Sequence, residues 1–357
     1  MSIPRLSLTL VLCALTLTAR AEEKALLIEL PSGTLPYDIS SNGMVVGELR
    51  SGGGFYWLPN TGVIYVGGQA AEAVSRAGDA IAGTAFDPRN VTQAAIWQRA
   101  AEWQLLGSVV PNATPCDALL SSTYDTSDDG KVIVGLAWNG CNFARAFRWD
   151  AATGMVDLGS TVAGRSSRAN GVSGDGRVVV GWQETSQGLR HGARWVDGRQ
   201  ELFRGPSVII GEAHAANRDG SVIVGQVCEF ASLENLFANQ QAWIWTARDG
   251  VQCLPPPRVR VLNNFIGVAS ATSEDGRIVG GSQSFGLEAE SIIWIDREPH
   301  YLKDYLRANG VPNAFEGWVN TGFVTGVSRD GRTLVGQGAG RRDFQGFIVS
   351  LGSGARP

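Results

Sequence analysis

The side chains best suited to chemistry recur in one motif, a Ser or Asn followed two residues later by Asp-Gly. Its aspartates are Asp129, Asp175, Asp219, Asp275 and Asp330. A calcium loop would need several oxygen ligands at alternate positions, which no copy of the motif offers. An aspartate before glycine instead accepts hydrogen bonds from nearby backbone groups and shapes its own turn. We therefore predict a structural role for these carboxylates.

Other reactive residues are sparse. The three histidines, His191, His214 and His300, are far apart and have no metal-binding spacing. The segment GVSGDG at 171–176 lacks both the Gly-x-Ser-x-Gly pattern and the following helix of a nucleophile elbow. No carboxylate pair has a spacing that indicates glycoside hydrolysis, although such pairs need not be close in sequence. The sequence therefore identifies no catalytic residue, no cofactor site and no metal site.

Tryptophans form a second recurring series. Six of them stand near the end of an apolar segment, at positions 57, 97, 149, 195, 245 and 294. Their regular placement predicts packing between neighbouring repeats rather than a carbohydrate platform. Trp138 and Trp182 lie elsewhere, after the second apolar run of their repeats. We expect these two side chains on an exposed face, where they are candidates for ligand binding.

The first 21 residues have the features of a cleaved export signal. Arg5 precedes the apolar stretch 6–18, and Ala19-Arg20-Ala21 fits the small-x-small cleavage rule, so Glu22 is the expected mature start. The stretch is too short to span a bilayer, and no later segment could cross a membrane. Removing the two arginines changes the formal net charge from −4 to −6, which argues against a nucleic-acid partner. We expect export to the periplasm or beyond the cell.

Four cysteines remain after the signal: Cys116, Cys141, Cys228 and Cys253. An even number in an exported chain favours disulfides, and the CxxC spacing of a zinc site is absent. Both neighbouring pairs are 25 positions apart. Four cysteines allow three connectivities, of which we favour Cys116–Cys141 with Cys228–Cys253.

The turn motif is one part of a larger repeat. Seven copies, with glycines at 43, 78, 130, 176, 220, 276 and 331, each separate two short apolar runs, as a β-hairpin does. A Trp-ending segment and a fourth apolar run follow most copies. Four short strands at this period predict an all-β fold, a seven-bladed β-propeller. The repeats lie near 34–68, 69–108, 120–160, 166–205, 210–256, 266–302 and 320–351.

The two ends of the chain complement each other. The last repeat stops after its third strand, whereas residues 24–31 form a strand that belongs to no other repeat. Pairing them would complete the last blade and remove two open sheet edges. We therefore predict one domain over 22–357. A short helix is expected near 302–309, because LKDYLRAN precedes Gly310, a good residue for a helix end.

Three insertions distinguish the repeats from one another: 107–122, 228–241 and 304–318. All three, with the predicted disulfides, fall on the connections between second and third strands or between repeats. These connections share one face, which we call the loop face. The insertions either bind a ligand or cover the central channel. The Asp-Gly turns lie on the opposite face, the turn face, and we expect seven equivalent turns around a ring not to converge on one site.

The pattern DGRVVVG…AFRW…MVDLG resembles the HAF-repeat family of predicted extracellular bacterial proteins. YLKDYLRANGV followed by GWVNTGFVTGVSRDGRTLVGQG is the most specific part of the match. Departures are Ala77 in place of the usual aspartate and a last repeat without its tryptophan. The resemblance implies an exported, propeller-like repeat protein. It supplies no catalytic or ligand-binding residues.

Two functions fit these observations. The first is a monomeric, non-enzymatic binding or scaffold propeller whose loop face meets a protein or glycan partner. The second is a polysaccharide lyase or glycosidase with its site at the channel mouth. Propellers serve both purposes, so the fold cannot decide. Two or more carboxylates, or a His–carboxylate pair, meeting in one pocket would favour the enzyme.

Overall fold

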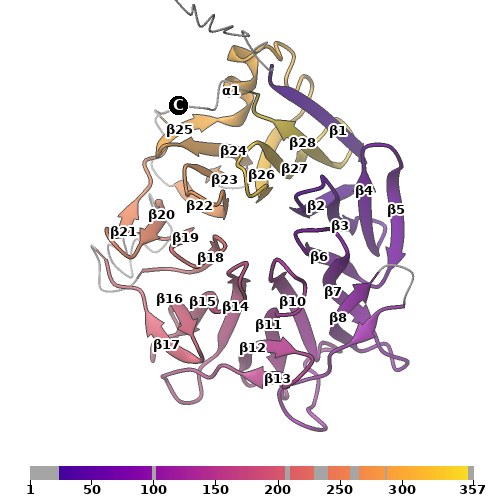
Figure 1. The fold of residues 1–357 in the computed structure, drawn as a ribbon, viewed down its shortest axis with the longest axis vertical. Coiled ribbons are helices and arrows are strands. Elements are labelled where there is room, and N and C mark those ends of the chain that lie inside the picture. Colours follow the sequence, from indigo (N-terminus) through magenta and orange to yellow (C-terminus); the bar gives the residue numbers. More distant parts are fainter. Residues whose placement is uncertain are drawn as a thin grey trace, which may run out of the picture.

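The fold is a ring of small antiparallel β-sheets. The computed structural model describes residues 24–98, 102–205, 210–228, 240–257, 265–285 and 288–352. The predicted signal at 1–21 and most of the 228–241 insertion lie outside these residues. Figure 1 shows the sheets in chain order around a centre, with the first strand of each sheet innermost. This arrangement confirms the predicted all-β propeller class.

The strands follow the repeats, and each group is called a unit. Unit 1 has β2 (Thr34–Ile39), β3 (Val45–Leu49), β4 (Gly54–Leu58) and β5 (Gly62–Gly67). Unit 2 has β6 (Ala70–Val74), β7 (Ala80–Phe86), β8 (Thr92–Gln98) and β9 (Gln104–Leu105). Unit 3 has β10 (Ser121–Thr126), β11 (Ile133–Trp138), β12 (Ala144–Asp150) and β13 (Gly154–Asp157). Unit 4 has β14 (Ser167–Val172), β15 (Val178–Glu184), β16 (Arg190–Val196) and β17 (Arg199–Leu202).

The remaining units complete the ring. Unit 5 has β18 (Ala213–Ala216), β19 (Val222–Gln226), β20 (Ala242–Thr246) and β21 (Gly250–Cys253). Unit 6 has β22 (Phe265–Thr272), β23 (Ile278–Phe285), β24 (Glu288–Ile295) and β25 (Glu298–Tyr301). Unit 7 has β26 (Asn320–Val327), β27 (Thr333–Ala339), β28 (Phe344–Ser350) and β1 (Leu26–Ser32). Units 5 and 6 join into one eight-stranded sheet through a single β19–β22 pair, Gln226 with Val268.

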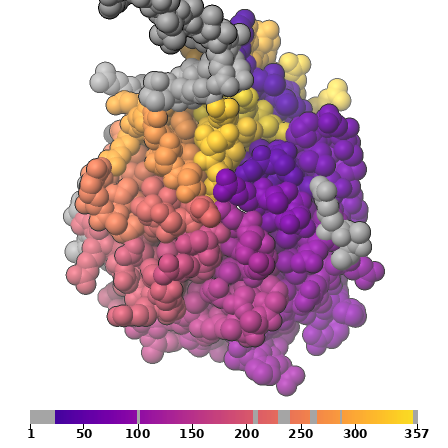
Figure 2. Space-filling model, in the orientation of Figure 1, coloured from indigo at the N-terminus to yellow at the C-terminus, as the bar shows by residue number. Residues whose placement is uncertain are grey.

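The N-terminal strand β1 pairs antiparallel with β28, the last strand of the chain, in the way predicted from the sequence. Leu26 lies opposite Ser350, and Ile28 lies opposite Ile348. Leu30 is 1% exposed and packs with Val335 and Ile348. Figure 2 shows the indigo N-terminal residues lying directly against the yellow C-terminal ones. The ring is therefore closed by a sheet made from both ends of the chain.

The insertion at 304–318 contacts both β1 and the segment after β28. Its helix α1 (Leu302–Ala308) matches the predicted helix and is followed by Gly310 with a φ of +99°. The Tyr305 hydroxyl donates to the carbonyl of Leu351, and the Trp318 indole donates to Glu29 of β1. Figure 1 places α1 beside β25 and close to β1 and β28. This insertion therefore packs on the outside of units 6 and 7 and does not cover the channel.

Packing between units uses the predicted tryptophans. Trp195 and Trp294 are 1% exposed, and each indole N–H donates to a carbonyl of the preceding unit, Leu158 and Pro255 respectively. The sequence series missed Trp243, which is fully buried between units 4 and 5 against Phe203. An indole thus supplies both apolar area and one directed bond at these junctions.

The Asp-Gly turns confirm the structural role predicted for their carboxylates. Asp129 accepts a hydrogen bond from the Ser127 hydroxyl at 2.7 Å and another from the backbone N–H of Lys131 at 3.1 Å. The same two bonds recur at Asp175, Asp275 and Asp330. Glycine follows in each copy with positive φ, for example +68° at Gly130.

Candidate binding site in the central channel

Every innermost strand carries a β-bulge at the same place. In unit 3 the register with β11 shifts between Thr123 and Asp125, so Tyr124 is an extra residue. The same shift occurs in the other six units, and all seven extra residues line one central cavity. These bulge residues are Tyr37, Glu72, Tyr124, Asn170, His214, Ser270 and Thr325. The same bulge in every unit therefore turns seven side chains, of six residue types, toward one axis.

The glycine of the second strand permits the close approach at each bulge. A Cβ atom on Gly281 would lie 1.8 Å from the carbonyl oxygen of Val268 on the innermost strand. The corresponding distances at the other six glycines are 2.0 to 2.3 Å, at Gly47, Gly83, Gly135, Gly181, Gly225 and Gly336. A real side chain cannot occupy such a space, so the repeated apolar-apolar-Gly signature is a steric requirement of the bulge.

The cavity has a volume of about 160 Å³, which is room for a small polar group or several waters. The smaller bulge side chains also join the units to one another. Thr325 donates to the carbonyl of Pro36 at 2.8 Å, and the amide of Asn170 donates to the carbonyl of Ala213 at 2.8 Å. In both cases the acceptor directly precedes the bulge residue of the next unit. Among the described residues, no such hydrogen bond to the next unit is made by the larger bulge side chains, which are Tyr37, Glu72, Tyr124 and His214.

Carboxylates of three units line the same cavity. The residues that follow two of the bulges, Asp38 and Asp125, accept the backbone N–H groups of Val74 and Val172 in the next units, at 2.9 and 2.8 Å. Burial raises the pKa of the Asp125 carboxyl to about 7, and the neighbouring Asp38 adds to the effect. Burial, with a smaller effect of Glu48, raises the pKa of Glu72 to about 8. The cavity wall thus contains acids that are protonated near neutral pH.

The other large bulge residues are also uncharged. Burial raises the pKa of the Tyr37 phenol, whose hydroxyl donates to Glu48 at 3.0 Å. Burial lowers the pKa of His214, which keeps the imidazole neutral despite nearby Glu212. The Nε2 atom of His214 is buried and has no hydrogen-bond partner among the described residues. At neutral pH these bulge side chains are therefore polar but uncharged, whereas the cavity wall also includes the charged side chains of Arg76, Asp128 and Arg329.

Stability should fall as the pH rises because of Glu72. Its pKa is about 8 in the folded protein and lies near 4.5 when exposed, so the folded state keeps a proton that the unfolded state has lost. This contribution is complete below about pH 4.5 and is lost as the pH rises toward 8. We expect the Glu72→Gln variant to unfold at higher urea concentration than the wild type at pH 8.5, and at a similar concentration at pH 4.5. An equal urea midpoint for the two proteins at pH 8.5 would contradict this.

The turn face holds a cluster that the sequence analysis excluded. Asp128, which stands between Ser127 and Asp129 in the turn of unit 3, meets three arginines that occupy the same position in the turns of other units. Arg329 donates to Asp128 at 2.7 Å, while Arg76 and Arg218 both lie 3.7 Å from it. The expectation that seven turns cannot converge is therefore wrong. The aspartates that cap the turns do stay apart, but residues that directly precede the capping position, such as Asp128 and Arg329, meet near the axis.

Asp128 should hold the turn face together. The Asp128→Ala substitution leaves the guanidinium of Arg329, only 22% exposed, without this partner. We expect a loss of about 2 kcal/mol in the free energy of unfolding, because an ion pair of limited exposure is broken on one side only. The loss should shrink in high salt. Urea titrations at low and high ionic strength measure it. Glu201→Ala is the matched control, because it removes the more exposed partner of another arginine, Arg194; equal losses for the two variants would argue against the cluster.

The two tryptophans proposed for an exposed face differ from the expectation. Trp182 is 4% exposed and lies within β15, where the guanidinium groups of Arg168 and Arg190 cover its ring at 5.4 and 4.5 Å. Exposure was therefore the wrong prediction for Trp182. Trp138, the last residue of β11, is half-buried, and its indole nitrogen has no hydrogen-bond partner among the described residues. Its part in ligand binding stays a prediction.

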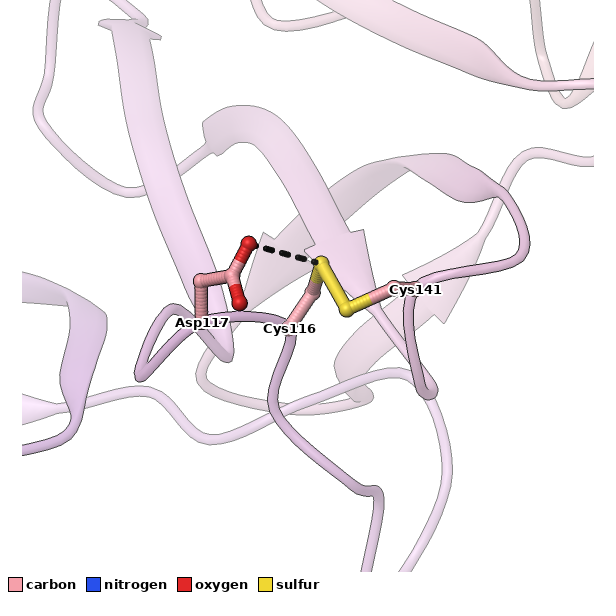
Figure 3. Close-up of side chains that lie close together, drawn as sticks. All are labelled: Cys116, Asp117 and Cys141. Carbon is pink, nitrogen blue, oxygen red and sulfur yellow. Dashed lines mark hydrogen bonds between the residues drawn. A yellow bond between two sulfur atoms is a disulfide. The ribbon is translucent and has the colours of Figure 1, made fainter.

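Both predicted disulfides are present, Cys116–Cys141 and Cys228–Cys253. Cys228 is fully buried in the core between units 4 and 5. Figure 3 shows Asp117 beside the first disulfide, with its carboxylate 3.9 Å from the Cys116 sulfur. A disulfide sulfur has no proton to donate and no thiolate charge. These three residues, although close together, therefore do not form a metal site.

The bulge residues were missed because their type varies from unit to unit. Each stands three positions before the Ser or Asn of its turn, mostly between small residues, as in AEAVS, ANGVS and ASATS. The small residues suggested a crowded inner strand, and the variable polar residue between them was the signal of a lined channel. The sequence was searched for residues that recur in every repeat, and the bulge position does not carry a recurring residue.

No family model matches the chain, and no curated protein matches it. The β-propeller domain of the Trilobed protease from Pyrococcus furiosus aligns with a TM-score of 0.52 and 12% identity, over 92% of this chain and 96% of that chain. U3-55K aligns with a TM-score of 0.52 and 12% identity, over 91% of this chain and 98% of that one. These similarities support the β-propeller fold and nothing finer.

TolB from Acinetobacter baumannii is a more distant match. Its TM-score is 0.45 at 13% identity, and the alignment covers 77% of this chain and 62% of that one. The Trilobed protease propeller has an open velcro topology, whereas β1 pairs with β28 here. Within the described residues, no helix is long and apolar enough to cross a membrane.

Proposed function

We propose that the protein is an exported, non-enzymatic binding propeller that takes a polar group of a glycan into its central channel. The bulge residues carry this proposal: the same β-bulge, repeated in every unit, presents seven side chains of six residue types to a single cavity. A scaffold that presents varied side chains at its axis is suited to selecting a ligand there. Hydroxyl, amide, imidazole and protonated carboxyl groups suit a ligand rich in hydroxyl groups.

The finer features of the fold belong to the same proposal. We count seven blades, with the joined sheet of units 5 and 6 counted as two, in a single domain over 22–357. The repeats support membership of the HAF-repeat family, and the two disulfides support export to the periplasm or beyond the cell. A closed ring with paired edges supports a monomer.

A glycan array probed with the chain from Glu22 tests the proposal. We expect binding to a restricted set of glycans, with affinities then measured by calorimetry. His214→Ala and Tyr37→Phe should each weaken binding about tenfold, because each removes a group that faces the ligand. Tyr65→Phe is the matched control, since Tyr65 is 63% exposed on an outer strand. Equal affinity in all three variants, or binding to no glycan, would overturn the proposal.

An enzyme is the second candidate, and one observation favours it. Asp38, Glu72 and Asp125 line the same cavity, which meets the condition of converging carboxylates. Glu72, with a pKa of about 8, has the protonation state of a general acid at neutral pH. Incubation with the glycans that bind, followed by measurement of reducing ends and of unsaturated products, tests this. Product formation that disappears in Glu72→Gln supports the enzyme; intact glycans support the binding protein.

A further inference from the structure

Two arginines share one tryptophan at the junction of units 4 and 5. On the sheet of unit 4, Arg168 of the innermost strand lies opposite Trp182, and Trp182 lies opposite Gly192. Arg190 is two residues before Gly192 on β16, so it lies diagonally across from Trp182 on the same face of the sheet. Gly192 has no side chain, which leaves room for the Arg190 side chain to reach the indole. Both guanidinium groups lie over the indole ring. Arg168 and Arg190 are called the arginine pair; their contacts with Trp182 are cation–π interactions.

A single carboxylate serves both arginines. Glu212, which precedes β18 of unit 5, is 3% exposed. Arg168 donates to its Oε2 atom at 3.0 Å, and Arg190 donates to its Oε1 atom. Within ion-pair distance, two guanidinium groups therefore face one carboxylate. Glu184 lies opposite Arg190 in the register, but its carboxylate accepts the backbone N–H of Ser166, and it forms no ion pair within 4.0 Å among the described residues.

Arg190 is the accessible member of the pair. Its side chain is 52% exposed, against 22% for Arg168, and one of its five N–H donors is engaged by Glu212. The indole N–H of Trp182, although buried, has no acceptor among the described residues. The cluster therefore has more hydrogen-bond donors than acceptors. Such a site selects an anion with two acceptor oxygens, which is the chemistry of a carboxylate.

The arginine pair adjoins the channel. The guanidinium of Arg168 lies 4.9 Å from the ring centre of Tyr124, and its Nε donates to Asn170 at 2.6 Å. Tyr124 and Asn170 are both bulge residues of the cavity wall. Tyr124 is 37% exposed, so one face of a sugar ring can pack on it. A ligand in the channel therefore has a positive group within reach of its carboxylate.

We propose that the arginine pair binds the carboxylate of an acidic sugar, so that the glycan of the proposed function is a polyuronide or a glycan with uronic acid units. The inference depends on the proposed function for the channel and adds the charge of its ligand. Arg190 donates to the carboxylate, Arg168 and Glu212 hold Arg190 and Trp182 in place, and Tyr124 supports the ring. The acidic chain as a whole would repel such a ligand, which makes a local positive site necessary.

The test uses a glucuronic-acid oligosaccharide and the same oligosaccharide with its carboxylates reduced to alcohols. Calorimetry with the chain from Glu22 should show binding of the acidic form and at least tenfold weaker binding of the reduced form. Arg190→Gln should weaken binding of the acidic form about tenfold and leave that of the reduced form unchanged. Arg194→Gln is the matched control, because Arg194 also lies over a tryptophan, Trp245, and pairs with Glu201.

The outcomes separate the two proposals. Equal affinity for the acidic and reduced forms, or an equal loss in Arg190→Gln and Arg194→Gln, overturns the carboxylate site and leaves a glycan-binding channel standing. Binding of neither form, while other glycans on the array bind, overturns the carboxylate site alone. Binding of no glycan at all overturns both. Unchanged thermal unfolding of Arg190→Gln shows that a loss of affinity comes from the lost donor and not from misfolding.

Discussion

A chain that begins at Gly33, without β1, is expected to lose its stable monomeric fold. The deletion removes Leu30, which is 1% exposed; loss of a buried leucine side chain alone costs about 2–5 kcal/mol. It also uncovers the edge of β28 that pairs with β1. The backbone N–H and C=O groups along this edge lose their partners, and buried residues such as Ile348 and Val349 lose part of their cover. Together these losses approach the whole stability of a typical domain, about 5–15 kcal/mol.

Size-exclusion chromatography and circular dichroism measure this result. The shortened chain should elute as aggregates or swapped oligomers and lack a cooperative melting transition. The matched control begins at Lys24, keeps β1 and should melt as a monomer. A synthetic peptide of residues 24–33 should restore a monomer when added during refolding, because the strand contributes through pairing alone. A shortened chain that stays monomeric and melts within a few degrees of the control would show that closure is dispensable.

Replacing Gly281 with alanine is expected to cost about 3 kcal/mol or more in the free energy of unfolding. The added methyl group would lie 1.8 Å from the carbonyl oxygen of Val268, which is backbone and cannot rotate away. To relieve the contact, β22 and β23 must separate where β22 carries its bulge. The same movement displaces Ser270, whose hydroxyl donates to the carbonyl of Val324 in unit 7 at 2.5 Å. One methyl group should therefore disturb the sheet, the cavity and a junction between units.

Urea unfolding of Gly281→Ala measures this loss. Gly198→Asn is the control. Unlike Gly281, Gly198 has a positive φ, of +77°, in a hairpin turn, and it has no atom within 4 Å of a built Cβ; asparagine tolerates that conformation. The control should unfold within about 0.5 kcal/mol of the wild type. Similar losses at both positions would mean that glycine flexibility, rather than the close contact, explains the repeated residue. Gly135→Ala should behave like Gly281→Ala, because its built Cβ lies 2.0 Å from the carbonyl of Ser122.

Much of the scaffold could be predicted because its determinants are local or repeated. An Asp-Gly turn between apolar runs specifies a hairpin within about ten residues, and the match of Asp129 with Ser127 follows from backbone geometry. Cysteine spacing and the missing last strand were sufficient for the disulfides and for the pairing of β1 with β28. These features need no knowledge of where side chains meet across the ring.

The channel could not be predicted in the same way, because it depends on contacts between residues far apart in the chain. Arg329 and Asp128 are separated by about 200 positions, and nothing in either repeat indicates that they meet. Trp182 looked exposed because it follows an apolar run, but the arginines of neighbouring strands cover it. The only sign of the bulge in the sequence is the varied residue three positions before the Ser or Asn of each turn, since the extra residue is absorbed within a strand of ordinary length.

The sheet shared by both chain ends has a consequence for how the molecule could be rebuilt. Leu26 faces Ser350, so the start of the first strand and the end of the last lie side by side. Circular permutation that moves residues 24–32 behind residue 352 would keep the same contacts while making every strand of unit 7 continuous in sequence. The longest-range pairing in the molecule would become a local hairpin. Folding of the permuted chain should then be faster at similar stability, because fewer distant segments must meet before the ring closes.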